Sequence, residues 1–80
     1  MSGSIARRQA LPHLIDEARA AVRTTRRIRD RFEFLSGHAN NARERIDFAS
    51  TSDQWDEELE SVATRLAELE RELAALEVAQ

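Results

Sequence analysis

The sequence predicts an all-α protein, an antiparallel helical hairpin of the coiled-coil type with a short helix in the connection. In two long stretches, apolar residues recur at alternating steps of three and four, which is the spacing of a heptad seam. Strand-forming residues are sparse, with no tyrosine and one tryptophan. Two glycines and one proline in 80 residues leave few points at which a helix must end. Two long helices joined by a modest connection pack most simply side by side and antiparallel.

Pro12 marks the expected start of the first helix, which is predicted over residues 12–35. Proline suits a first helical turn because it lacks the N–H that this turn leaves unpaired. Residues 1–10 carry no clear pattern and are expected to form a flexible N-terminus. Gly37 is expected to end the helix in the left-handed conformation common after helix C-termini. The apolar positions, here named the first seam, are Leu11, Leu14, Ala18, Ala21, Thr25, Ile28, Phe32 and Leu35.

A second long helix is predicted over residues 53–79. Acidic residues crowd its first turn, where the positive end of the helix dipole favours them. Ser52 or Asp53 suits the N-cap position. Its steps of four and three run without error through the second seam, which consists of Trp55, Leu59, Val62, Leu66, Leu69, Leu73 and Leu76.

The connection is predicted to contain a short helix over residues 41–49. Asn41 followed by Glu44 has the spacing of a capping box at a helix start. The serines and threonine of the following "STSD" favour caps over helix interiors, so a break is expected there. One helical face of this short segment carries Ala42, Ile46 and Ala49.

The alternative is one continuous helix from 40 to 79. The register disfavours it, because extending the face of Ala42 and Ile46 would place Asp53 and Asp56 on the seam. In either case residues 11–80 are expected to form a single helical domain.

Charge is divided unevenly along the chain, with a net charge of +4 over residues 1–35 and −7 over residues 51–80. In heptad letters with Leu14 and Trp55 at d, an antiparallel pair places e opposite e and g opposite g. This predicts two intramolecular pairs, which are Arg29–Asp56 and Arg31–Glu58. Each exposed pair contributes only about 0–1 kcal/mol, so their main effect is on orientation and partner choice.

Four other arginines point outward on the same helix and remain available to a partner: Arg19, Arg23, Arg26 and Arg27. They form either an ordinary solvated face or a surface that binds phosphates or an acidic protein. The chain lacks zinc-finger and RNP-like motifs and is acidic overall, with a pI of about 5.3. A nucleic-acid-binding regulator that uses this Arg-rich face is therefore the alternative function.

Several apolar residues lie outside a two-helix contact. Ile15 and Val22 occupy e positions beside the first seam, and Phe34 has no place in a bare hairpin. Either the middle segment folds back over them in a three-helix domain, or two hairpins associate into a four-helix bundle. We expect the second, a homodimer, because two helices alone leave much apolar surface exposed.

The sequence offers no catalytic residues, cofactor site, metal site or small-molecule substrate pocket, so the chain is not expected to be an enzyme. His13 and Glu17 are one helical turn apart, but zinc needs at least three protein ligands. There is no cysteine and no apolar run of membrane-spanning length. We expect a cytoplasmic protein without a membrane partner, a non-catalytic interaction, assembly or chaperone-like module that acts through helix packing on itself or another protein.

The last 17 residues, "TRLAELERELAALEVAQ", resemble the end of the N-terminal coiled-coil hairpin of hantavirus nucleoproteins. The overall form is also similar in shape to the small helical-hairpin chaperones of type III secretion. Heptad composition accounts for the first resemblance, and neither assigns the chain to a family.

Overall fold

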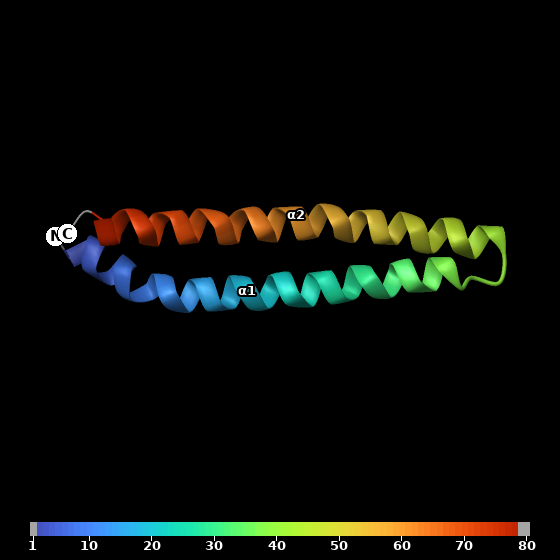
Figure 1. Ribbon diagram of the computed structural model, residues 1–80, viewed down its shortest axis with the longest axis horizontal. Helices are drawn as coiled ribbons and strands as arrows, with labels where there is room; N and C mark the ends of the chain where they lie inside the picture. Colours follow the sequence, from blue (N-terminus) through green and yellow to red (C-terminus); the bar gives the residue numbers. More distant parts are fainter. Residues whose placement is uncertain (1, 79–80) are drawn as a thin grey trace.

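The computed structural model describes residues 2–78, with side chains from residue 5 onward. Two long helices, α1 (Ser2–Gly37) and α2 (Ala42–Val78), run antiparallel beside each other (Figure 1). The hairpin measures 60 × 16 × 14 Å, so in cross-section it is no wider than a single pair of helices. This arrangement confirms the predicted all-α antiparallel hairpin.

The two predicted seams form the contact between the helices. Every member of the first and second seams is buried or half-buried. Leu11, Ile15 and Leu69 form the core, with exposed fractions of 0%, 5% and 3%. The core therefore lies nearer the open end than the loop. Packed against it are Leu14, Ala18, Leu66, Leu73 and Leu76.

Contacts near the loop end of the hairpin fix its register. The rings of Phe32 and Phe48 are 6.4 Å apart between centroids, so facing residues have numbers that add to about 80. The hydroxyl of Ser36 donates a hydrogen bond to the carbonyl oxygen of Arg45 at 3.1 Å, which is consistent with this register. The same rule places Thr25 opposite Trp55 and brings a small polar side chain against a large apolar one.

The predicted short helix over 41–49 and the break before residue 53 are wrong, because α2 is continuous from Ala42. Phe48 and Ser52 precede Trp55 by seven and three residues, so they extend the second seam toward the loop without a change of register. Phe48 is half-buried and Ser52 is 4% exposed. The three-helix alternative therefore does not occur. The predicted end of this helix at residue 79 lies outside the described residues.

The sequence predicted two helix caps at the loop, one at Asn41 and one at Gly37. The side-chain oxygen of Asn41 accepts a hydrogen bond from the Glu44 N–H at 2.9 Å, and the Glu44 carboxylate accepts one from the Asn40 N–H at 3.3 Å. The Asn41 bond is the N-cap half of the expected capping box, and it begins α2 rather than a separate helix. The Glu44 carboxylate reaches the N–H of Asn40, one residue before the N-cap. The predicted left-handed Gly37 is wrong, since no described glycine has a positive φ. Instead, the His38 N–H donates to the Phe34 carbonyl at 3.1 Å as α1 ends.

The first helix starts ten residues before its predicted start at Pro12, so the expected flexible segment is helical from Ser2. Pro12 lies inside α1, where it cannot donate to the Arg8 carbonyl, and such a site bends a helix. The N-terminal part of α1, blue in Figure 1, is inclined toward the end of α2. Arg7 Nε donates to Glu72 Oε2 at 2.6 Å, and Arg8 Nη2 donates to the Leu76 carbonyl at 2.8 Å. These long-range contacts hold the segment in place.

Candidate protein-interaction surface

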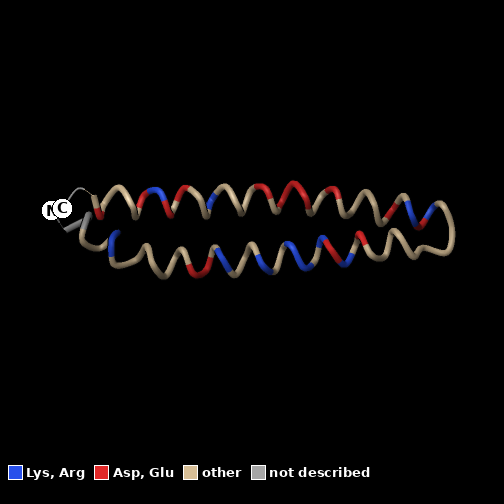
Figure 2. Tube along the Cα trace, viewed as in Figure 1, with Lys and Arg blue, Asp and Glu red and all other residues tan. Residues whose placement is uncertain are grey.

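The two helices carry charge of opposite sign. From the sequence, α1 has a net charge of +4 and α2 a net charge of −7. Basic residues gather along the middle of α1, whereas acidic residues dominate the middle of α2 (Figure 2). The middle of the hairpin therefore presents a basic edge and an acidic edge, and a surface of this kind can recognise a partner with the same division of charge.

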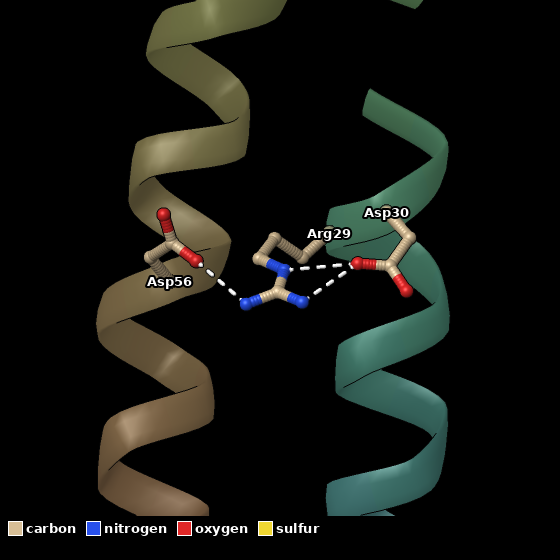
Figure 3. Close-up of polar contacts among 3 residues, drawn as sticks. All are labelled: Arg29, Asp30 and Asp56. Atoms are coloured by element: carbon tan, nitrogen blue, oxygen red, sulfur yellow. Dashed lines mark hydrogen bonds and ion pairs between the residues drawn. The ribbon is translucent and has the colours of Figure 1, made fainter. Parts of the chain in front are cut away.

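The predicted pair between Arg29 and Asp56 is present. The Nη1 atom of Arg29 lies 3.2 Å from Asp56 Oδ1, and its Nη2 and Nε atoms donate to Asp30 Oδ1 at 2.7 and 3.1 Å (Figure 3). The side chain of Arg29 is 24% exposed and crosses from α1 to α2. The pKa of Arg29 is raised, first by the hydrogen bond to Asp30 and then by the bond to Asp56. Both carboxylates therefore favour the charged form of the guanidinium.

The second predicted pair, Arg31–Glu58, does not form an ion pair within the described part of the chain. With a rise of about 1.5 Å per residue and the observed register, these two residues are offset by about 13 Å along the hairpin. Arg19 and Glu70 have the same offset, and their side chains approach only to 3.9 Å. The shorter offset of Arg29 and Asp56 explains why their contact is closer.

The four outward arginines divide into two groups. Arg19 contacts Glu70 loosely, so it is not fully available as the sequence suggested. Arg23, Arg26 and Arg27 are exposed and line a shallow depression with Asp30. None of these three has an ion-pair partner among residues 5–78.

The three apolar residues predicted to contact a partner differ in their burial and contacts. Ile15 is 5% exposed inside the core, so its assignment to a partner surface was wrong: its e position lies against Leu11 and Leu69. Val22 is half-buried. Phe34 is 61% exposed, and its ring stacks on the His38 ring with centroids 4.1 Å apart. Phe34 is therefore engaged at the loop end, where the helices turn.

A surface that the sequence reasoning missed runs along one side of the hairpin. It consists of the heptad b positions of both helices, all of which are exposed. A shallow groove beside it near the open end has Pro12, Ile15, Leu73 and Ala74 along its apolar part. The same heptads that define the seams also define this surface, because each b position directly follows an a position of a seam. We name this surface the association face: Ile5, Pro12, Arg19, Arg26 and Glu33 of α1 with Ile46, Asp53, Glu60, Ala67 and Ala74 of α2.

The association face is part apolar and part charged. Ile5 and Ile46 are 62% and 67% exposed, which is high for isoleucine. Neither Asp53 nor Glu60 has an ion-pair partner within residues 5–78, so both carboxylates point into solvent uncompensated. The face offers apolar and charged contacts together, as protein interfaces do.

Metal-ligating side chains do not gather anywhere in the described part of the chain in groups of three or more. His13 Nε2 lies 3.0 Å from Glu17 Oε1, and both side chains are well exposed. Neither described helix is long and apolar enough to cross a lipid bilayer. What the described residues bring together is a charged, partly apolar helix surface.

The fold and this surface define an antiparallel helical hairpin with a divided charge pattern. Comparison with models of protein families, with curated protein sequences and with solved structures gave no significant match. The function is therefore argued from the geometry of the hairpin itself.

Proposed function

We propose that this chain is a non-catalytic assembly module, with a chaperone-like or scaffolding role, that binds protein through helix packing in the cytoplasm. The observation that carries the proposal is the imbalance between core and surface. The hairpin exposes 6025 Å². A globular monomer of the same mass would expose about 4900 Å². Only Leu11, Ile15 and Leu69 are buried apolar residues in the described part of the chain.

So small a core gives little stability by itself. Burying each such side chain contributes roughly 1.5–3 kcal/mol, against a conformational entropy cost of about 1–2 kcal/mol for every ordered residue. Covering more of the hairpin by another protein would improve this balance. The charge division supports selectivity, because a partner must match a basic helix and an acidic helix at once.

The test is site-specific photocrosslinking with a benzophenone amino acid. Placed at Ala67, on the association face, the probe is expected to give a covalent adduct to a protein in the native lysate. An excess of unmodified chain should compete the adduct away. Placed at Thr64, on the outer side of α2, the same probe is expected to give none. No protein adduct at Ala67, or equal adducts at both positions, would contradict the proposal.

Nucleic-acid binding is the second candidate, and one observation favours it. Arg23, Arg26 and Arg27 are exposed together without ion-pair partners among the described residues. Asp30 sits beside them, and the exposed ring of Phe34 is stacked on His38 rather than presented to bases. Binding through phosphates would weaken steeply with salt. A mobility-shift assay at low salt that shows no complex with RNA or DNA would exclude this function.

A further inference from the structure

The association face matches a second copy of itself when one alignment is chosen. Two hairpins packed face to face by a two-fold axis can be arranged in two ways. With the axis along the hairpin, both loops lie at the same end and α1 faces α2 of the other copy. With the axis across the hairpin, the loops lie at opposite ends and each helix faces its own copy.

The register decides which residues meet in the first arrangement. An axis along the hairpin keeps every residue at its own height, so facing residues of the two copies again have numbers that add to about 80. Arg19 then faces Glu60 of the other copy, and Arg26 faces Asp53. Both contacts join opposite charges, and each occurs twice because of the symmetry.

The apolar members of the face also meet one another in this arrangement. Ile5 faces Ala74 of the second copy, and Pro12 faces Ala67. All four are exposed in the single hairpin. The apolar contacts lie near the open end and the charged ones nearer the middle and loop. Only Glu33 and Ile46, at the loop end, form an unlike pair.

The opposite arrangement is poor in charge. An axis that crosses the hairpin at its middle places Arg19 near Arg19 of the other copy. It likewise places Glu60 near Glu60 of the other copy. Like charges directly opposed in an interface disfavour that alignment. The division of charge between the two helices therefore selects one of the two arrangements.

Covering the face is feasible in area. A compact protein of twice the mass would expose about 8100 Å², which is about 4000 Å² less than two separate hairpins. Standard interfaces bury about 1,600 Å² in total, so the hairpins have ample surface for one. Arg29 and Asp56 lie beside the face, and Arg29 is already bonded to two carboxylates, so covering it leaves no unpaired cation.

We propose that two copies of this chain pair through the association face with their loops at the same end, so that the basic α1 of each packs on the acidic α2 of the other. The inference rests on the proposed function of protein association and adds the partner and its orientation. It predicts a four-helix bundle in which all neighbouring helices are antiparallel.

Spin-label distances test the orientation, and the chain has no native cysteine to interfere. A label at N40C, in the loop, is expected to give an intermolecular distance below about 25 Å, the width of two packed helix layers. Loops at opposite ends would instead give a separation near the 60 Å length of the hairpin. A label at T64C, near mid-length, gives a short distance in either arrangement and so reports pairing alone.

The outcomes separate the two proposals. Short distances at both positions support the same-end pair. A short distance at residue 64 with a long one at residue 40 overturns the orientation but leaves protein association standing. No intermolecular distance at either position overturns self-pairing, and the photocrosslinking at Ala67 then decides whether another protein occupies the face.

Charge variants test the residues, with sedimentation equilibrium as the measurement. The double variant R19E/R26E is expected to weaken pairing at least tenfold, and so is D53R/E60R. Mixing the two variants should restore it, because every facing pair is then again of opposite charge. The matched control R23E/R27E, on the outer side of α1, should pair like the unmodified chain. Equal weakening by the control, or no rescue on mixing, would overturn the proposed contacts.

Discussion

Arg29 of α1 and Asp56 of α2 form an ion pair across the hairpin, with Nη1 and Oδ1 3.2 Å apart. Asp30 shares the same guanidinium from the other side. The contact joins two segments that are 27 residues apart in the sequence, near the loop half of the molecule. It ties the basic helix to the acidic one and helps to fix the register that the seams require.

Reversing this pair should show its direction of effect. R29E places a carboxylate beside Asp30 and Asp56, so the melting temperature is expected to fall by a few degrees. Adding D56R should recover part of the loss. The matched control R31E reverses a charge that has no ion-pair partner among the described residues and should change the melting temperature less. If the R29E/D56R double variant were no more stable than R29E, the ion pair between residues 29 and 56 would not contribute to the stability of the hairpin.

Truncating the core should be far more damaging than truncating the surface. Leu69 is 3% exposed and packs on Leu11 and Ile15. Leu69→Ala is expected to lower the free energy of unfolding by about 2–5 kcal/mol, since it leaves a cavity in a core with little to spare. Glu68→Ala, its exposed neighbour, should cost less than about 0.5 kcal/mol. Urea unfolding followed by circular dichroism measures both, and similar midpoints would show that the seam is misplaced.

The polar member of the first seam should be a site of gain. Thr25 is 6% exposed and lies opposite Trp55 in the register. Replacing it with valine keeps the shape and removes a hydroxyl from an apolar contact, so Thr25→Val should raise the free energy of unfolding by about 1 kcal/mol. The adjacent Thr24 is exposed, and Thr24→Val provides the control with nearly no effect. A loss of stability in Thr25→Val would show that the hydroxyl supplies a needed bond.

The N-terminal turns of α1 should respond locally. The Arg7 and Glu72 side chains are 40% and 41% exposed, so their ion pair contributes less than about 1 kcal/mol. Arg7→Ala should leave the melting temperature nearly unchanged but speed amide hydrogen exchange in residues 5–11. The rest of α1 should keep its protection. Uniform acceleration along α1 would instead show that this segment folds together with the core.

Much of the site could be predicted because it follows from heptad spacing. The seams, the Asn41 cap on the Glu44 N–H and the Arg29–Asp56 pair all depend on local sequence spacing and on one assumption, antiparallel packing. The exposure of the arginines at positions 23, 26 and 27 followed from the same heptad assignment. The association face was available from the sequence too, but its residues gain meaning only when both helices are set in register.

What the sequence determined by itself was the pair of helices and the side that each one buries, because a 3.5-residue apolar period is a property of the chain alone. Tertiary contact decided the rest. Ser52 is buried and the second helix unbroken because packing against α1 covers that position, which no local propensity reveals. The helix before Pro12 is held by Arg7 and Arg8, whose partners lie on α2, 65 and 68 residues away. Ile15 belongs to the core because α2 supplies Leu69 to cover it, and that depends on how far one helix slides along the other.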